Sequence, residues 1–514
     1  MKAAQKRSGW FGRFSSNAWH RWKGKGPLHH DHLRLHRFLS SRPAMAFFST
    51  TATHGGHLRT LDHLLAKHQR LDGRRAADIK VIVAMSGGVD STVSALLLKR
   101  KGFNVKALFM KNWDRQEERE GGECEADRDY AEVRRLCARL GVPLLGRVEL
   151  VREYWMEVFM PLVESVREGH TLNPDSLCNM EIKFKHFVNH CLERWEDVDY
   201  IATGHYARIF EEDDEDGKKG RVQLWRGVDE CKDQTFWLMG VPQAALRRMI
   251  FPVGEMTKEQ VRSIAQKEGF DHQATKKSSS GICFIGRRDF PTFIQQYLDT
   301  KPGPFRDIDS NDILGQHDGF CLYTIGQGAR VPGCAQKMYV VAKDKESNTV
   351  YLGGGQRHPS LYVNRFNVDK VHWIAGEAPK ILEVDSLFCF LLFIFFFVCC
   401  VHSFFFFSAV FSLLLIISNQ EQKFINCQYR IRNTQELSSC TLIPLSSLPN
   451  SSTTADPSSS SSFQVQLERP KRAVTMQQSV AFYDGQACLG GGFISQVGPS
   501  FWDMRLPLPT HVVR

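Results

Sequence analysis

The chain has 514 residues, of which 42% are hydrophobic and 24% charged, and its formal net charge is +10. Residues 1–50 carry ten Lys or Arg against one acid, so this leader holds +9 and the rest of the chain only +1. The composition therefore excludes a basic surface spread over the whole protein, and any RNA-binding patch must be local. The fourteen cysteines contain no Cys-x-x-Cys pair, which does not favour a zinc or iron–sulfur site.

The basic leader is rich in Arg, His, Ser and aromatic residues and nearly free of acids. This composition is typical of a mitochondrial transit peptide rather than a secretory signal. We therefore expect residues 1–50 to be a transit peptide and the protein to lie in the mitochondrial matrix, where a disulfide scaffold is not favoured. The alternative is a basic tail that targets nothing.

The first predicted elements of the folded part are a strand at residues 79–83, a Gly-Gly turn and a helix that begins near residue 92. The turn has the sequence Ser-Gly-Gly-Val-Asp-Ser over residues 86–91. Backbone N–H groups at such a helix N-terminus favour anions, and glycines let phosphates approach. The Walker pattern would add a lysine, which this loop lacks. Asp90 stands there instead, as a candidate Mg²⁺ ligand.

Further strands and helices continue the alternation, with a strand at 105–109, a helix at 130–140 and a strand near 198–202. This order predicts an α/β fold with a doubly wound parallel sheet over residues 78–289. Short strands separated by glycines then predict a small strand-rich domain at 290–360 and a β-barrel at 361–500.

Two inserts interrupt the predicted barrel. Residues 450–462 form a Ser/Thr-rich low-complexity loop. Residues 387–417 contain no Asp, Glu, Lys or Arg but eleven of the 36 Phe. That run is long and apolar enough for a membrane span. Because it splits a β domain, we interpret the insert at 386–420 as a translated intron and expect no membrane unless 387–417 is a real span.

Two cysteines lie in loops that could carry nucleophilic chemistry. Cys178 follows an Asn-Pro-Asp turn, and Cys283 follows a Ser-rich run. A loop cysteine near a general base is a candidate nucleophile, although a free cysteine is more often a small buried hydrophobe.

The turn at residues 86–91 resembles the PP-loop of ATP pyrophosphatases. Further motifs follow it in the order found in tRNA-specific 2-thiouridylases: residues 109–114, 173–179, 203–208, 232–234, 281–286, 323–327, 429–430, 482–485 and 488–492. The ordered set is highly specific and spans about residues 79–494, apart from the inserts. One departure is that Gln477 stands where the family has glycine, after Met476 in place of proline.

The resemblance implies three groups of site residues. ATP is expected along the PP-loop and two neighbouring positions: Ala84, Met85, Ser86, Gly87, Gly88, Val89, Asp90, Ser91, Met110 and Gly204. The catalytic residues are expected to be Cys283, which carries a persulfide, Cys178, the partner thiol, and Asp175, an acid/base. Contacts with tRNA are expected from Asn173, Pro174, Asp175, His205, Lys232, Asp233, Gln234, Tyr429, Arg430 and Gln478.

The reaction implied is ATP-dependent 2-thiolation of the wobble uridine in the anticodon loop of mitochondrial tRNA. Adenylating the uracil 2-oxygen makes AMP a leaving group, and the base must leave the anticodon stack. Either the persulfide attacks the base and Cys178 resolves the disulfide, or Cys178 first releases hydrosulfide from Cys283. The expected cofactors are ATP and Mg²⁺. A cysteine desulfurase or sulfur carrier is expected to deliver the persulfide sulfur.

Two other functions remain open from the sequence alone. Another PP-loop ligase or amidotransferase would need an amide or ammonia donor instead of a thiol pair. A membrane-anchored nucleotide-binding protein would use residues 387–417 as its span.

Overall fold

The computed structural model describes residues 56–114, 125–212, 220–276, 289–379, 424–447 and 462–513. Within these ranges, none of the helices is both long and apolar enough to cross a membrane. The expected transit peptide, the apolar insert at 386–420, nearly all of the loop at 450–462 and Cys283 lie outside the described residues.

The first domain is built on a parallel five-stranded sheet in the order β4-β3-β2-β5-β8. Its strands are β2 (Lys80–Ala84), β3 (Asn104–Lys111), β4 (Leu144–Glu149), β5 (Tyr200–Ala202) and β8 (Met249–Ile250). The chain moves outward from β2 to β4 and then returns to add β5 on the other side of β2. This reversal confirms the predicted doubly wound sheet and puts its switch point between β2 and β5.

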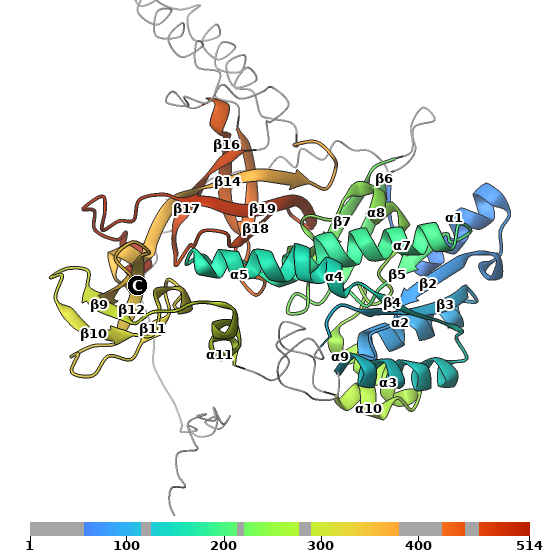
Figure 1. Cartoon of the computed structure of the whole chain (residues 1–514). Coiled ribbons are helices and arrows are strands. Elements are labelled where there is room, and N and C mark those ends of the chain that lie inside the picture. The colour runs from blue at the N-terminus through green and yellow to red at the C-terminus, as the bar shows by residue number, and fades with distance from the viewer. Residues whose placement is uncertain are drawn as a thin grey trace, which may run out of the picture. The chain divides into compact units, whose positions relative to one another are not determined.

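Helices cover both faces of this sheet (Figure 1). One face carries α2 (Val89–Arg100), α3 (Glu125–Leu140), α9 (Lys258–Lys267) and α10 (Asp271–Thr275). The other carries α4 (Val151–Tyr154), α5 (Met160–Arg167), α6 (Pro174–Leu177), the π-helical segment η4 (Cys178–His186) and α7 (Phe187–Arg194). Side chains of strand β2 point alternately to the two faces of the sheet: Val81 and Val83 enter one core and Ile82 enters the other.

The central domain is a five-stranded sheet in the order β10-β9-β13-β12-β11. Its strands are β9 (Gly303–Asp307), β10 (Ile313–His317), β11 (Gly328–Ala329), β12 (Met338–Asp344) and β13 (Thr349–Gly354). A small core forms around Phe305, Val340 and Leu352. The short helix α11 (Phe290–Ile294) precedes this sheet.

Six antiparallel strands close the C-terminal barrel, because β18 pairs with both β15 and β19. They are β14 (Tyr362–Trp373), β15 (Ile425–Arg430), β16 (Ser438–Pro444), β17 (Phe463–Arg472), β18 (Ser479–Asp484) and β19 (Ala487–Val497). The predicted central domain and C-terminal barrel are thereby confirmed as fold elements.

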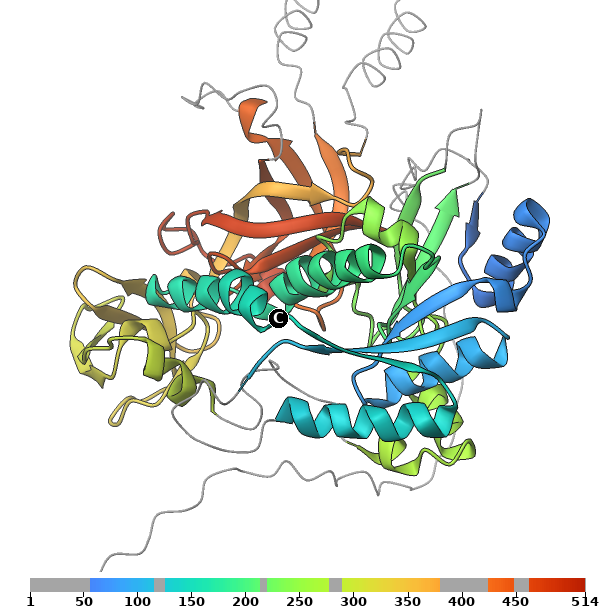
Figure 2. The same cartoon turned by 45° about the vertical axis from the view of Figure 1, so that its right-hand side comes forward.

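Strand β19 also joins the barrel to the first domain. It pairs with β7 (Val222–Arg226), which continues through β6 (Ala207–Glu212) to β1 (Gly56–Leu58). Figure 2 shows the β6–β7 hairpin between the parallel sheet and the barrel. Helices α1 (Leu61–Asp72) and α8 (Gln243–Arg248) flank this region. Helix α14 (Thr510–Val513) ends the described chain.

Candidate active site

The predicted phosphate loop connects β2 to α2 at the switch point of the sheet, where α/β folds bind ligands. Gly87 adopts φ 77°, a left-handed conformation that favours glycine. The N-cap residue of α2 is Gly88, which has no side chain that could accept a hydrogen bond from the first N–H groups of the helix. The Ser91 hydroxyl donates to the carbonyl of Gly88 at 3.1 Å and lies 3.2 Å from the Ser86 hydroxyl. The Ser86 N–H also donates to the Ser91 hydroxyl at 3.3 Å, so these two serines brace the loop internally.

Gly204, after the end of β5, lies against the beginning of α2. A Cβ at this position would come within 2.8 Å of the Ser91 nitrogen and 2.9 Å of the Asp90 backbone. Only glycine fits that approach without a shift. The structure therefore places Gly204 against the β2–α2 loop, and its contact with a nucleotide stays a prediction.

The other expected nucleotide residues lie at or near the ends of β2 and β3. Ala84 ends β2, Met85 is buried directly after it, and Met110 is half-buried near the end of β3. Asn112 follows, and its buried Oδ1 lacks a hydrogen-bond partner within the described ranges. A glycine-lined loop with an unfilled buried acceptor beside it fits a polyphosphate nucleotide with a donating base or ribose.

The carboxylate of Asp90 is held by two residues that follow distant strands. The Lys258 Nζ lies 2.7 Å from both Asp90 oxygens, and the Tyr206 hydroxyl donates to Oδ1 at 2.8 Å. Lys258 begins α9, far along the sequence from the loop. Sequence reasoning missed this lysine entirely.

Residues 173–178, which we call the thiol turn, lead to Cys178. Asn173 caps α6 by accepting a hydrogen bond from the Asp175 N–H at 2.8 Å. Cys178 follows at the start of η4 and is 3% exposed. Burial raises the pKa of the Asp175 carboxyl, although the charge of Lys183 opposes that shift. Asp175 therefore keeps its proton to a higher pH than an exposed aspartate does.

His205 connects the thiol turn with the phosphate loop. Its ring lies 5.5 Å from that of Phe184, which belongs to the same helical segment as Cys178, and its Nδ1 is 2.8 Å from the Thr203 hydroxyl. Burial lowers the pKa of His205 well below its usual range, and Lys183 adds to the effect. His205 is therefore neutral at physiological pH and next to Gly204 in the chain.

The barrel and the central domain both fix the segment that leads to the thiol turn. The Ser176 and Ser479 hydroxyls are 2.8 Å apart, and the Thr171 N–H donates to the Met476 carbonyl at 3.1 Å. Lys343 of β12 donates to the carbonyl of Gly169. The Asn-Pro-Asp turn therefore depends on all three domains for its position.

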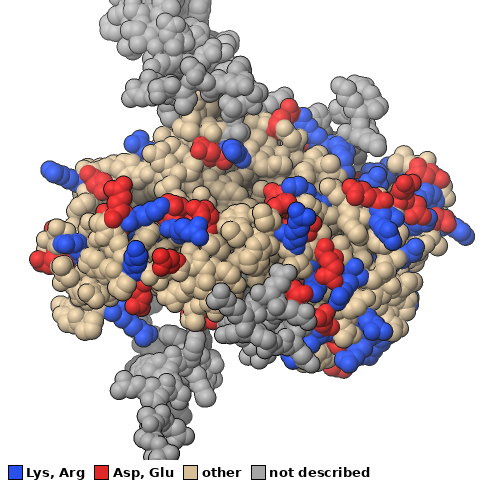
Figure 3. Space-filling model, viewed as in Figure 1, with Lys and Arg blue, Asp and Glu red and all other residues tan. Residues whose placement is uncertain are grey.

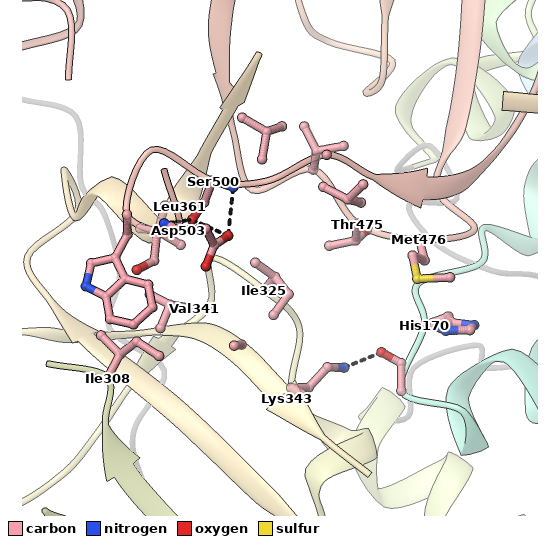
Figure 4. A pocket seen from close by; sticks show the side chains of 18 of the residues that line it. His170, Ile308, Ile325, Val341, Lys343, Leu361, Thr475, Met476, Ser500 and Asp503 are labelled. Atoms are coloured by element: carbon pink, nitrogen blue, oxygen red, sulfur yellow. Dashed lines mark hydrogen bonds between the residues drawn. The ribbon is translucent and has the colours of Figure 1, made fainter. Parts of the chain in front are cut away.

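A cavity of about 320 Å³ lies beside this segment, between β12, the barrel and residues 168–170 (Figure 4). Lys343 donates to the Gly169 carbonyl there, and the Ser500 hydroxyl donates to Asp503 at 2.7 Å. The buried His170 Nδ1, Ser360 Oγ and Thr475 Oγ1 atoms, which also line the cavity, lack a hydrogen-bond partner among the described residues. We assign the chemistry to the end of the parallel sheet that carries the β2–α2 loop, because this cavity contains none of the residues of that loop.

The expected tRNA contacts divide into exposed and buried residues. Lys232 is exposed and Gln234 and Gln478 are half-buried, but Asp233 is 1% and Arg430 2% exposed. Tyr429 is fully buried in the barrel core, and burial raises the pKa of its hydroxyl. In this conformation the side chains of Asp233, Tyr429 and Arg430 thus face the protein interior.

Arg430 belongs to a buried polar network between β15 and the loop after β7. It forms an ion pair with Asp233 and donates to the Tyr483 hydroxyl at 2.8 and 3.0 Å. Asp233 also accepts the N–H groups of Gly227 and Thr235, each at 3.2 Å. The network fixes the loop that presents Lys232 at the surface.

Gln234 ties the same loop to the phosphate site. Its Oε1 accepts the Tyr206 N–H at 2.9 Å, and its own N–H donates to the Tyr206 carbonyl at 3.0 Å. The Tyr206 hydroxyl in turn reaches Asp90. Asp233 and Gln234 are neighbours in the chain, so the loop between β7 and η5 (Thr235–Leu238) connects the barrel network to the phosphate loop.

Positive and negative side chains are interleaved on the face shown in Figure 3. That face carries no broad basic field. This agrees with the near-neutral charge of the chain beyond its leader.

Comparison with known proteins covers all three domains. The family described as tRNA methyl transferase HUP domain matches residues 79–287, the tRNA methyl transferase PRC-barrel domain matches 291–354, and the aminomethyltransferase β-barrel domain matches 411–494. A solved complex of a 4-thiouridine synthetase with RNA and ATP covers 42% of this chain and 49% of its own, with 15% identity and a TM-score of 0.25.

Curated relatives match over nearly their whole length. Mitochondrial tRNA-specific 2-thiouridylase 1 of Gallus gallus is 37% identical over 455 residues, which are 84% of this chain and 95% of the relative. The tRNA-specific 2-thiouridylase MnmA of Bacillus subtilis is 37% identical over 434 residues, covering 84% of this chain and 99% of the relative. The domain descriptions name methyl transfer, but the matches that extend across all domains carry the thiouridylase name. The chain therefore belongs to the tRNA-specific 2-thiouridylase family.

Proposed function

We propose that this protein uses ATP to replace the 2-oxygen of the wobble uridine of mitochondrial tRNA with sulfur. The observation that carries the proposal is that Gly204 packs against the β2–α2 loop while the next residue, His205, lies 5.5 Å from the ring of Phe184, in the helical segment that begins with the buried Cys178. Uridine thiolation needs both a phosphate loop and a thiol, because the 2-oxygen is a poor leaving group until it is adenylated. Another PP-loop ligase or amidotransferase would instead need an amide or ammonia donor.

In the first step, the uracil 2-oxygen attacks the α-phosphorus of ATP, and pyrophosphate leaves. The uncapped N–H groups at the start of α2 would hold the phosphates, and Gly204 leaves room for them. Asp90 is the side chain we assign to Mg²⁺, which would offset phosphate charge when bound.

In the second step, sulfur reaches C2 and AMP leaves with the original oxygen. In one route the persulfide of Cys283 attacks C2, and the Cys178 thiolate then attacks the Cys283 sulfur, which forms a disulfide and frees the thiocarbonyl. In the other route Cys178 attacks first, and the released hydrosulfide adds to C2. Both routes end with a Cys178–Cys283 disulfide that a thiol reductant must open, and a donor protein must restore the persulfide.

We assign Asp175 to proton transfer at this site and Asn173 and Pro174 to placement of the base. His205, Lys232, Gln234 and Gln478 are the proposed tRNA contacts. Asp233, Tyr429 and Arg430 would act on tRNA through the loop and the barrel wall that they hold together. The buried ion pair supports this indirect role.

An isotope experiment tests the order of bonds directly. Transcribed tRNA carrying ¹⁸O at the uridine 2-position is incubated with the protein, ATP, Mg²⁺, a thiol reductant, and a cysteine desulfurase with cysteine as the source of persulfide sulfur. The proposal expects the label in the AMP product, as seen by mass spectrometry. Unlabelled AMP would show that the 2-oxygen is never adenylated.

Two cysteine variants separate adenylation from sulfur transfer. We expect Cys178→Ser and Cys283→Ser each to abolish thiolation while ATP binding survives, because the phosphate loop is separate from the sulfur relay. Cys334→Ser, a half-buried thiol in the central domain, is the matched control. Wild-type thiolation by either site variant would contradict the assignment.

We also propose a mitochondrial matrix location, on the composition of residues 1–50 and the naming of the chicken relative. Fusing residues 1–50 to a fluorescent reporter tests whether these residues direct a protein to the mitochondrial matrix. Reporter that stays in the cytosol would contradict it.

A further inference from the structure

The phosphate loop has an acidic side chain where the Walker pattern has a lysine. Its sequence ends in Val-Asp-Ser over residues 89–91 and supplies no cation for the β- and γ-phosphates. A polyphosphate brought into this loop would therefore meet the charge of Asp90 without a nearby compensating group from the loop itself.

The structure supplies a cation from α9. The Nζ of Lys258 lies 2.7 Å from both oxygens of Asp90, and the Lys258 side chain is 12% exposed. The ammonium also lies 5.6 Å from the centre of the Tyr206 ring, whose hydroxyl bonds the same carboxylate. Lys258 thus reaches the point where a bound polyphosphate would need positive charge.

Local structure fixes the origin of this side chain. Thr257 and Gln260 form a reciprocal capping box at the start of α9, and the Lys258 N–H donates to the Asp229 carboxylate at 2.9 Å. The backbone of Lys258 is therefore anchored. Its four-carbon stem keeps the freedom to move the ammonium between nearby anions.

A second cation lies one turn further along the same helix face. Arg262 follows Lys258 by four residues, and its buried Nε lacks a hydrogen-bond partner among the residues that the structure describes. The charge of Arg262 acts on Tyr206, where it opposes the upward pKa shift caused by burial. Two basic groups of α9 therefore face the region of Tyr206 and Asp90.

We propose that Lys258 is the polyphosphate-binding lysine of this site and that it exchanges Asp90 for the β- and γ-phosphates when ATP binds. The inference rests on the proposed use of ATP. Without nucleotide, Lys258 neutralises Asp90. With metal and nucleotide, Asp90 turns to the metal ion and the ammonium turns to the phosphate oxygens, so each charge keeps a partner. No covalent bond changes in this exchange.

Binding measurements without tRNA test this exchange. The variants are Lys258→Met and Lys258→Arg, with Lys267→Met, an exposed residue of the same helix, as the matched control. The probes are the non-hydrolysable α,β-methylene analogue of ATP with Mg²⁺, and AMP. Titration calorimetry gives each dissociation constant, and thermal unfolding without nucleotide checks the fold.

The Lys258→Met variant should bind the ATP analogue about 10- to 100-fold more weakly, because a hydrogen bond between charged groups contributes about 1.5–3 kcal/mol. Its affinity for AMP should stay unchanged, and Lys258→Arg should retain most of the affinity for the analogue. Wild-type affinity in Lys258→Met, or equal losses for AMP and the analogue, would overturn the inference.

A double variant separates phosphate binding from a purely structural ion pair. If Lys258 serves only to neutralise Asp90, Asp90→Asn combined with Lys258→Met should recover wild-type affinity for the analogue measured in EDTA, where Asp90 has no metal ion to bind, and the inference would be overturned. The exchange instead predicts that the double variant stays weak. Failure of the wild-type protein to bind the analogue would overturn the proposed use of ATP as well, so the two failures are distinguishable.

Discussion

Replacing Arg430 by methionine should loosen the contact between the barrel and the first domain. Methionine keeps much of the stem volume but removes every donor that reaches Asp233, Thr235 and Tyr483. Asp233 would then be a buried carboxylate with its principal cationic partner gone. Removing one member of a buried pair costs about 3–5 kcal/mol, a large share of a domain's stability.

Hydrogen exchange of residues 227–238 measures this effect where it arises. Global unfolding of a three-domain chain is not a two-state process, so a local measurement is preferable. We expect Arg430→Met to exchange much faster there, and Arg430→Met combined with Asp233→Asn to recover most of the protection. The asparagine oxygen can still accept the N–H groups of Gly227 and Thr235.

The exposed Arg469 of β17 provides the control, because its replacement by methionine removes a charge from the same barrel without touching the network. Unchanged exchange in Arg430→Met together with a loss of tRNA affinity would refute the reasoning. That result would make Arg430 a direct contact instead of a positioning residue.

Three further changes test other parts of the structure. Gly204→Ala should lower ATP-analogue affinity at least tenfold without unfolding the chain, since its Cβ would come within 2.8 Å of the Ser91 nitrogen; calorimetry at wild-type affinity would contradict this. Gln477→Gly should raise stability by about 1 kcal/mol in thermal unfolding, because Gln477 adopts φ 62°, and a lower melting temperature would count against this strain. Burial alone would raise the pKa of Glu211, but Arg59 and Lys67 hold it below the usual 4.5. The ionised Glu211 carboxylate therefore stabilises the fold above pH 4.5. This stabilisation is lost as the pH falls through the lowered pKa. Glu211→Gln should flatten the acid limb of a stability–pH curve, and an unchanged limb would exclude this role.

The phosphate loop could be predicted because its signal is local. A β-branched strand, two glycines and an apolar helix occupy consecutive residues, and the structure builds β2, the turn and α2 from them. The departure at Gln477 was equally visible, and the left-handed φ explains why glycine suits that position. Periodicity and turn chemistry need no tertiary information.

Lys258 could not be predicted in the same way. Thr257 and Gln260 indicate a helix start, but nothing local shows that the first residue of this helix contacts a loop 168 residues earlier. The ion pair exists because β5 and β8 add to the sheet beside β2 and carry the following segments to the phosphate loop. Such contacts depend on the order of the strands.

The orientation of Arg430 was partly accessible from strand alternation. Tyr429 and Arg430 are neighbours on β15, so one faces the barrel core and the other faces outward. Phe482 and Tyr483 of β18 repeat this division, with Phe482 in the barrel core and Tyr483 in the core of the first domain. The sequence did not show that the outer face of the barrel is covered by the first domain.

Mass spectrometry of treated tRNA tests the proposed thiolation of the wobble uridine. Unmodified transcript is incubated with the purified protein, ATP, Mg²⁺, a thiol reductant, and a cysteine desulfurase with cysteine as the source of persulfide sulfur, and is then digested to oligonucleotides. We expect the fragment that contains the wobble uridine to gain the mass of an oxygen-to-sulfur exchange, only with ATP and not with Cys178→Ser. A gain of a methyl group, or an unchanged fragment under these conditions, would contradict the proposal.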